Sequence, residues 1–384
     1  MATVLVTGGT GFFGHNLVKA LLEDPRVETV HVYARNLPPT ENKLSRWAVD
    51  GRSMISGIPE PLNATGDRVV QSDDPDAIFA NPRVRFFRGE ICDSKALSEA
   101  AEGCSVMFHA CGDTRWWNAI DWDQGCTNIQ GTDTALRVAR SSLTIRAFIH
   151  TSTVDVMGHA DIPINEDHEG YSYADFGYNY ADTKRDADLA VQRSVTSFAH
   201  EGKRVVIIRP ASMLGPWDVS DQYGRLFGEL KSRSLAGVPC GGTSVCHVHD
   251  VALAHITAAF APTLEHSVFI CAGTNMTYLQ LFQTMRGMLH DYKDNNDGPI
   301  GGLCGKQIIP RSLLVVYGWL CECYSNVWSG EEPEVNPGLA RYMSCPAYYS
   351  SERAQRELGY PDQSRRWIEA IVESYEWYRA RGRF

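Results

Sequence analysis

An apolar strand, a glycine-rich loop and an amphipathic helix follow one another at the start of this 384-residue chain. Glycines at the spacing GxxGxxG allow a tight turn and let the backbone approach a pyrophosphate, which then lies at the helix N-terminus. A glycine turn without a ligand is the alternative, and the position between strand and helix argues against it. The candidate cofactor residues of this loop are Gly8, Thr10, Gly11, Phe12, Phe13 and Gly14.

Short apolar runs alternate with helix-length segments over the first half of the chain. Near-continuous apolar runs are typical of parallel strands buried on both faces. The pattern therefore predicts an α/β fold, a Rossmann-type doubly wound parallel sheet, with a smaller C-terminal substrate lobe. The expected strands are Thr3–Thr7, Val30–Ala34, Val84–Arg88, Val106–Ala110, Arg146–Ser152 and Arg204–Arg209.

The expected division is a dinucleotide-binding domain over 1–214 and a substrate-binding lobe over 215–384. Strands are expected at Val245–Val248 and Val268–Cys271, and segment 245–275 and the terminal helix should pack back on the Rossmann core. The segment 35–83 is long for a loop in a compact domain. It is either partly helical, over Lys43–Val49, or a mobile flap.

The charge balance restricts the partners. Lysine and arginine against aspartate and glutamate give 36 − 46 = −10, so nucleic acid and anionic membrane are not expected as main partners. Eleven cysteines without a CxxC motif, and a first strand directly after Met1 in place of a signal peptide, predict a reduced, cytoplasmic protein.

The end of the second strand bears on the cofactor. The run Tyr33-Ala34-Arg35 lacks the carboxylate that would accept from a ribose 2′-hydroxyl, and arginine suits a 2′-phosphate. We therefore expect NADP(H); the alternative is that Arg35 is a solvated loop charge.

A YxxxK motif supplies the candidate chemistry. Tyr180 and Lys184 lie one helical turn apart, and a neighbouring ammonium favours the phenolate form of a tyrosine. The hydroxyl-rich strand end Thr151-Ser152-Thr153 lies upstream and could hold a carbonyl oxygen.

These motifs together resemble the extended short-chain dehydrogenases/reductases, and within them the 3β-hydroxysteroid dehydrogenase and dihydroflavonol-reductase-like branch. The resemblance implies Thr153 as the catalytic hydroxyl, Tyr180 as acid/base and Lys184 as the residue that binds the nicotinamide ribose. It also implies cofactor contacts from Glu90, Ile91, Ala110, Cys111 and Pro210. The segments that carry it, besides the glycine loop and YxxxK, are Gly89–Asp93, Phe108–Cys111, Asn128–Thr132, Arg209–Pro216, His247–Ala252 and Glu357–Tyr360.

Asp155, two residues beyond Thr153, has two interpretations. If the strand continues, both side chains face the nicotinamide and Asp155 is a second acid/base or a substrate-hydroxyl anchor. If the strand has ended, Asp155 hydrogen-bonds loop amides. Candidate substrate contacts, which could instead be packed aromatic and apolar positions, are Asp113, Trp116, Trp117, Met213, Trp217 and Tyr223.

Two further features remain. His247 and His249 are expected on one strand face without enough partners for a metal. The run 312–321 is too short for a membrane span, which needs roughly 20 residues. It is either a covering helix or a monotopic membrane contact that helps an apolar substrate to enter.

The sequence thus predicts an NADP(H)-dependent oxidoreductase. It would interconvert a secondary alcohol and a ketone on a hydrophobic small molecule of polyketide, terpenoid, steroid-like or flavonoid-like type, such as secondary metabolism produces. The alternatives are a carrier-thioester reductase, a nucleotide-sugar epimerase or dehydratase, and a non-catalytic NADP-sensing regulator. A homodimer is a further expectation from the resemblance.

Overall fold

The computed structural model describes residues 1–36, 75–117, 121–160, 162–173, 175–232, 234–235, 237–289 and 308–383. Its largest element is a seven-stranded parallel sheet in the order β10-β6-β5-β4-β1-β2-β3. The predicted Rossmann-type sheet is confirmed. The strands are β1 Ala2–Thr7, β2 Val27–Ala34, β3 Val84–Arg88, β4 Val106–His109, β5 Ala147–Thr151, β6 Arg204–Pro210 and β10 Val268–Cys271.

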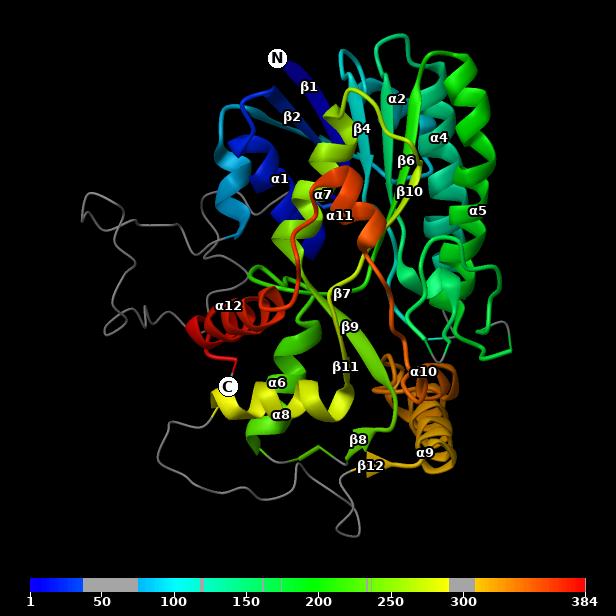
Figure 1. The fold of residues 1–384 in the computed structure, drawn as a ribbon, viewed down its shortest axis with the longest axis vertical. Coiled ribbons are helices and arrows are strands. Elements are labelled where there is room, and N and C mark those ends of the chain that lie inside the picture. The colour runs from blue at the N-terminus through cyan, green and yellow to red at the C-terminus, as the bar shows by residue number, and fades with distance from the viewer. Residues whose placement is uncertain are drawn as a thin grey trace, which may run out of the picture.

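Helices cover both faces of this sheet (Figure 1). Side chains alternate along β1, so that Val4 and Val6 join one core cluster and Leu5 joins the other. The first face carries α1 Phe12–Glu23, α7 Val248–Phe260 and α11 Glu352–Leu358; the second carries α2 Ser94–Ala100, α4 Gly131–Ser141 and α5 Asn179–His200. Both faces being buried explains the near-continuous apolar runs of the strands.

A second sheet begins where β6 ends. It has the order β11-β9-β7, with β7 Ser212–Leu214, β9 Gly242–His247 and β11 Thr274–Thr277. Three helices share an apolar cluster with it, α6 Gln222–Ser232, α8 Tyr278–Leu289 and α12 Arg366–Ala380. The lobe lies beyond the carboxyl ends of the large sheet (Figure 1).

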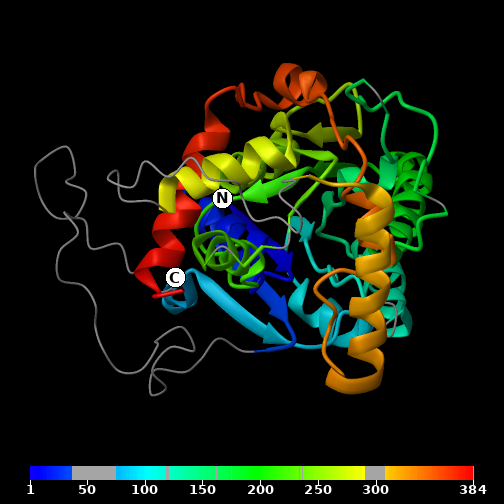
Figure 2. The same cartoon turned by 90° about the horizontal axis from the view of Figure 1, so that it is seen from below.

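The remaining elements are short pieces around these two layers. The lobe adds a two-stranded ladder, β8 Val238–Pro239 with β12 Ile308–Ile309, and the packed helices α9 Arg311–Tyr324 and α10 Pro337–Tyr342. Figure 2 shows α9 along one side of the molecule, seen from below. Short helices are η1 Pro75–Ala80, α3 Asp121–Gly125, η3 Cys126–Gln130, η4 Val154–Met157 and η6 Ser325–Ser329. Among the described helices, none is long and apolar enough to cross a membrane.

The expectations for the C-terminal half can be placed individually. Segment 248–271 packs back on the large sheet as α7 and β10, whereas α12 packs mainly against β7, β9, α6 and α8 of the lobe. The strand expected at Val245–Val248 ends one residue earlier, because Val248 begins α7. The proposed helix over Lys43–Val49 and most of segment 35–83 lie outside the described residues.

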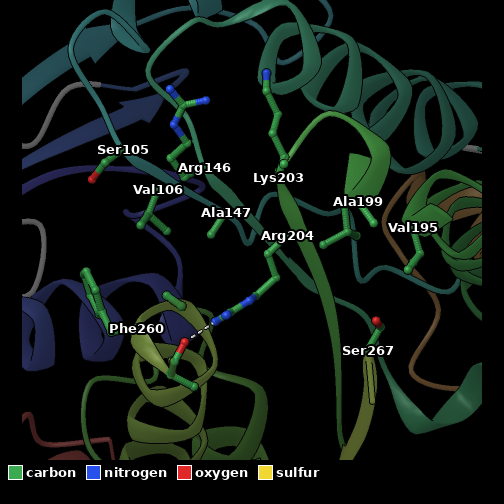
Figure 3. A pocket seen from close by; sticks show the side chains of 14 residues that line it. Ser105, Val106, Arg146, Ala147, Val195, Ala199, Lys203, Arg204, Phe260 and Ser267 are labelled. Atoms are coloured by element: carbon green, nitrogen blue, oxygen red, sulfur yellow. Dashed lines mark hydrogen bonds between the residues drawn. The ribbon is translucent and has the colours of Figure 1, made fainter. Parts of the chain in front are cut away.

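A cavity of about 620 Å³ lies at the amino ends of β4, β5 and β6 (Figure 3). Two of its cations are already engaged with helix ends. Lys203 Nζ donates to carbonyls at the end of α4, among them Ala139 at 3.0 Å, and Arg204 donates to the carbonyl of Ala261 at 2.5 Å after α7. Cations at helix C-termini stabilise the unpaired carbonyls there. Because the glycine loop follows the carboxyl end of β1, this cavity lies at the opposite edge of the sheet.

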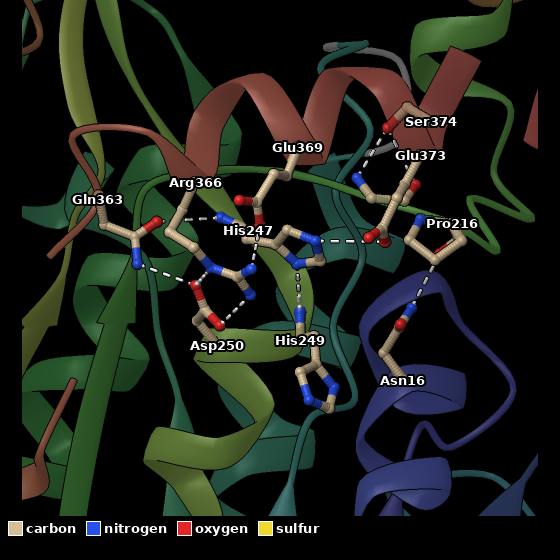
Figure 4. Close-up of polar contacts among 11 residues, drawn as sticks. Asn16, Pro216, His247, His249, Asp250, Gln363, Arg366, Glu369, Glu373 and Ser374 are labelled. Atoms are coloured by element: carbon tan, nitrogen blue, oxygen red, sulfur yellow. Dashed lines mark hydrogen bonds and ion pairs between the residues drawn. The ribbon is translucent and has the colours of Figure 1, made fainter. Parts of the chain in front are cut away.

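Ionic contacts at the junction join the lobe to the Rossmann part (Figure 4). Asp250, in the first turn of α7, accepts from Arg366 of α12 at 2.7 and 2.9 Å and from Gln363 at 3.0 Å. Ser374 of α12 bonds both backbone groups of Gly215. The sequence segments His247–Ala252 and Arg209–Pro216 thus supply the contacts that fix the lobe.

Candidate active site

The glycine loop after β1 has the geometry of a phosphate cradle. Gly8 has φ +72°, and a Cβ there would lie 2.7 Å from Cys111 Cα; a Cβ at Gly14 would lie 2.2 Å from Gly8 O. Only glycine fits both positions. Helix α1 begins at Phe12 with Gly11 as N-cap and no side-chain cap, so its first amides are available to an anion. A dinucleotide pyrophosphate fits this loop.

The residues expected around the adenosine lie at the ends of β2 and β3. Arg35 is exposed directly after β2. A hydrogen bond from Arg115 holds the pKa of Asp113 below its usual value against burial, and the Arg35 charge contributes to the same shift. Ile91 is buried, Glu90 is exposed, and the Glu90 carbonyl accepts from Tyr33 at 2.8 Å. Arg35 lies at the carboxyl end of β2, and its backbone carbonyl accepts from Arg88, at the end of β3, at 3.1 Å.

The candidate catalytic residues converge at the carboxyl end of β5. Thr153 caps η4, and Tyr180 in the first turn of α5 is hydrogen-bonded to it. Lys184 is buried, and its Nζ donates to the Thr151 carbonyl at 2.8 Å. The structure brings the three predicted side chains together, beside Ala110 and Cys111 at the end of β4 and Pro210 at the end of β6.

The electrostatics differ from the expected phenolate. Burial, and then the charge of Asp155, raises the pKa of Tyr180 well above 10, although the Thr153 hydrogen bond opposes this. Burial lowers the pKa of Lys184 to about 8, against the charge of Asp188. Tyr180 is therefore a neutral hydroxyl, which suits donation of a proton to a carbonyl oxygen.

A buried polar network beneath α5 was not expected from the sequence. Asp188 accepts from Arg209 of β6 at 2.7 and 3.0 Å and from Ser152 at 2.5 Å. Asn128 donates to Thr183 at 3.0 Å. These contacts fix the helix that carries Tyr180 and Lys184 against the sheet. No local motif marks Asp188, which lies one turn beyond Lys184.

Asp155 follows neither expected geometry. Strand β5 ends at Thr151, so the continued strand was wrong. Among the described residues, the Asp155 carboxylate accepts not from loop amides but from the hydroxyl of Tyr342 in α10, at 2.8 Å. Burial raises the pKa of Asp155 to about 6, while the hydrogen bonds from Tyr342 and Thr153 oppose the shift. Tyr342 is a site residue that sequence reasoning missed.

The candidate substrate contacts divide into two groups. Trp116 packs in the aromatic cluster of Tyr180 and Tyr342. The pKa of Tyr223 is raised by burial, then by the charge of Asp218, and to a smaller extent by that of Asp155. Asp113 and Trp117 lie in the loop after β4 and are held by other contacts. Asp113 forms an ion pair with Arg115, and the Trp117 indole donates to Asn326 at 3.0 Å.

Trp217 and Met213 belong to the second group. The Trp217 ring packs against the lobe core with Lys19 of α1 5.1 Å away, and Met213 packs against the core of the large sheet. The described contacts do not bring either residue to Tyr180.

His247 and His249 do not share a strand face. His247 ends β9 and its Nδ1 accepts from the amide of His249, which belongs to α7. The Nε2 atom of His247 lies 3.2 Å from Glu373. Both positions are accounted for by contacts at the start of α7.

Comparisons with known proteins agree with this geometry. Residues 4–269 match the family model described as the NAD dependent epimerase/dehydratase family. Sterol-4-alpha-carboxylate 3-dehydrogenase, decarboxylating, of Candida albicans is 24% identical, covering 94% of this chain and 93% of that one. The 2-alkyl-3-oxoalkanoate reductase of Stenotrophomonas maltophilia is 25% identical, with 94% of each chain covered.

The fold is shared with solved structures. UDP-glucuronic acid 4-epimerase from Bacillus cereus, solved with UDP-glucuronic acid and NAD, superposes with a TM-score of 0.66. Its sequence is 16% identical, and 98% of this chain and 99% of that chain are covered. The match over more than half of the chain, together with these relatives, shows that the protein belongs to the NAD dependent epimerase/dehydratase family, in the extended short-chain dehydrogenase/reductase branch.

Proposed function

We propose that the protein is an NADP(H)-dependent oxidoreductase that interconverts a secondary alcohol and a ketone on a hydrophobic small molecule. The observation that carries this proposal is the convergence of Thr153, Tyr180 and Lys184 at the carboxyl end of β5, beside the glycine loop. A sensor of NADP would need the loop but not these three side chains.

The chain's own groups supply binding and proton transfer. The glycine loop would hold the pyrophosphate, Arg35 the 2′-phosphate and Lys184 the nicotinamide ribose. When bound, the nicotinamide supplies a carbon that gives or accepts hydride. Thr153 donates a hydrogen bond to the substrate oxygen, and Tyr180 gives its proton to that oxygen in reduction or accepts it in oxidation. Asn128 and Asp188 keep α5 in place during both steps.

The aromatic surroundings of Tyr180 support an apolar substrate. The names of two relatives indicate a class of substrate. A sterol-4-carboxylate 3-dehydrogenase and a 2-alkyl-3-oxoalkanoate reductase both act at a carbon whose neighbour bears a carboxylate. We therefore place β-hydroxy and β-oxo acids with an alkyl branch first among candidate substrates, ahead of simple alcohols and ketones.

A lipid surface is the proposed route for such a substrate. Seven apolar side chains of α9 and η6 are each more than half exposed, Leu313, Val316, Trp319, Leu320, Tyr324, Val327 and Trp328. Tryptophan and tyrosine beside aliphatic residues are typical of helices that lie in a membrane interface. The loop with Trp116 and Trp117 bonds to this region through Glu332 and Asn326. Pairing of two copies stays a prediction.

The test is turnover of a substrate panel, followed by NADPH absorbance for the ketones and acids and by product analysis for the nucleotide sugars, because epimerases and dehydratases return the hydride to the substrate. The panel holds hydrophobic ketones, α-alkyl β-oxo acids and UDP-sugars. We expect reduction of one of the first two classes, and a loss of about 10²–10⁴-fold in Tyr180→Phe. The matched control is Tyr317→Phe, which should keep full activity. The Tyr317 hydroxyl donates to Glu334 on the α9 side of the lobe. Turnover of UDP-sugars alone would instead assign a nucleotide-sugar epimerase or dehydratase.

A further inference from the structure

The cavity at the amino ends of β4, β5 and β6 gathers positive charge (Figure 3). Its volume of about 620 Å³ lies within the range of about 300–1,000 Å³ that is typical of small-molecule sites. The described residues that line it include Arg146, Lys203 and Arg204 and no aspartate or glutamate. A concave surface of one charge sign attracts ligands of the opposite sign, here in a chain whose net charge is −10.

The three cations differ in how their N–H groups are used. The buried Lys203 Nζ donates to three carbonyls at the end of α4, at 2.5 to 3.0 Å. Arg204 donates to three carbonyls at the end of α7, at 2.5 to 3.3 Å. Arg146 is exposed, and among the described residues no hydrogen bond or ion pair engages its guanidinium. Arg146 therefore has donors to offer to a ligand, whereas Lys203 and Arg204 contribute mainly charge.

The backbone fixes the position of Arg146 at the start of β5. Its amide donates to the Ser105 carbonyl at 2.8 Å, and its carbonyl accepts from the Arg204 amide at 2.7 Å. Side chains alternate along a strand, so Arg146 lies on the same face of the sheet as Phe148, the face that α4 and α5 cover. Figure 3 shows the Arg146 and Lys203 side chains extending to the same side of the strands.

The charges of Arg146 and Lys203 affect each other. Burial lowers the pKa of Lys203, the charge of Glu201 opposes this shift, and the charges of Arg146 and Arg140 add to it. The Glu201 carboxylate is itself paired with Arg140 at 2.6 Å. An anion bound beside Arg146 would therefore reduce a repulsion that the described residues leave in place.

The walls beside Arg146 and Lys203 are apolar. Val195 and Ala199 near the end of α5, and Val205 of β6, line the same cavity. A free guanidinium matches the two oxygens of one carboxylate with two parallel hydrogen bonds. A phosphate group has more oxygens to satisfy, and the N–H groups of Lys203 are already given to carbonyls. The lining thus favours a carboxylate that is attached to an apolar chain.

We propose that this cavity is a second ligand site, which binds an amphipathic carboxylic acid. The carboxylate would lie against Arg146, in the positive field of Lys203, and the alkyl chain against Val195 and Ala199. The site lies at the amino ends of the strands, whereas Tyr180 and Lys184 act at the carboxyl ends. The inference requires no turnover, so its outcome is independent of the proposed function.

The test is isothermal titration calorimetry with octanoate, with octanol and inorganic phosphate as comparison ligands. We expect saturable binding of octanoate, tighter than that of either comparison ligand. Arg146→Gln should weaken octanoate binding about 10-fold and leave octanol binding unchanged, because only the carboxylate loses a charge-assisted hydrogen bond. Arg193→Gln, at an exposed position of α5 outside the cavity lining, is the matched control and should bind octanoate as wild type does.

A second variant tests the position of the chain. Ala199 is exposed at its place in the lining, so Ala199→Phe can fill the cavity without entering the core, and melting curves check the fold. It should weaken octanoate and octanol binding alike, several-fold. An octanoate with a diazirine at the end of its chain should label peptides of α5 or β6 on irradiation.

Three results would overturn the inference. These are absence of octanoate binding, octanoate binding that Arg146→Gln leaves unchanged, and phosphate binding as tight as that of octanoate. Label confined to α9 would equally overturn it, because the acid would then lie on the exposed apolar face of that helix. Each of these results leaves the hydride-transfer assay, and with it the proposed function, unaffected.

Discussion

Lys184 carries its charge in a place where burial opposes charge. Its Nζ meets the Thr151 carbonyl at 2.8 Å, and its pKa is lowered to about 8. The ammonium is therefore present below pH 8 and lost as the pH rises through that value. A lysine with the ordinary pKa near 10.4 would keep its charge over this range.

The pH dependence of hydride transfer follows from this shift. If the ammonium is needed for cofactor binding and proton transfer, kcat/KM for reduction should fall with a midpoint near pH 8. A pH–rate profile between about pH 6 and 10 measures it. Lys184→Arg, which keeps its charge over that range, is expected to be less active and to lack this limb. A limb of the same midpoint in that variant would assign the titration to another group.

Arg35 is the residue on which the choice of cofactor depends. Arg35→Asp removes a charge-assisted hydrogen bond, so NADPH affinity should fall about 10- to 100-fold. NADH affinity should change little. Fluorescence titrations of both cofactors check this, with Arg88→Ala as a control because Arg88 donates to the backbone carbonyl of Arg35 at 3.1 Å. A wild type that prefers NADH would contradict the prediction.

At the scale of the element, α9 has apolar side chains both against the protein and exposed at the surface. Leu314 and Gly318 face inward, whereas Leu313, Trp319 and Leu320 are more than half exposed. The sequence pattern alone allowed both a covering helix and a membrane contact. The covered face of α9 depends on its packing against α10 and Asn336. The Asn336 backbone lies so close to Gly318 that a Cβ there would clash with it.

Binding to vesicles tests the exposed face of α9. We expect the protein to float with phosphatidylcholine vesicles, and the triple change Leu313→Ser, Trp319→Ser and Trp328→Ser to reduce the bound fraction several-fold, because about 0.8 kcal/mol is lost per buried CH₂. Leu143→Ser, at a site on the Rossmann part that is even more exposed, should bind as wild type does. Equal binding of all three proteins would show that α9 does not contact lipid.

At the scale of the whole molecule, the strands and the glycine loop could be predicted from sequence because each depends on local pattern. Residues of YxxxK and the β5 end also carry local signals. Tyr342 does not, since it meets Asp155 across 187 positions of the chain, and no periodicity reports such a contact. The placement of Trp217 was equally out of reach, because its positive φ of 69° turns the chain after Pro216.

The Asp250–Arg366 pair tests how the two parts are joined. Among the described residues, Arg366→Ala leaves Gln363 as the remaining side-chain donor to the buried Asp250 carboxylate, so we expect a loss of about 3 kcal/mol in the free energy of unfolding. Thermal or urea unfolding measures it. Arg379→Ala, in the last turn of the same helix, is the control and should change stability by less than about 0.5 kcal/mol.

Two connections between the two sheets are very short, and at a third place no residue intervenes, because β9 runs directly into α7. One residue, Ala211, separates β6 from β7, and two residues separate β10 from β11. At the second connection a Cβ on Gly273 would overlap the carbonyl of Val245. A chimera that takes the substrate lobe from a relative therefore needs at least three breakpoints, at both connections and between His247 and Val248, with residues 248–271 retained from the host. A single breakpoint at 214 would replace α7 and β10 as well, and would leave the parental sheet without its outermost strand.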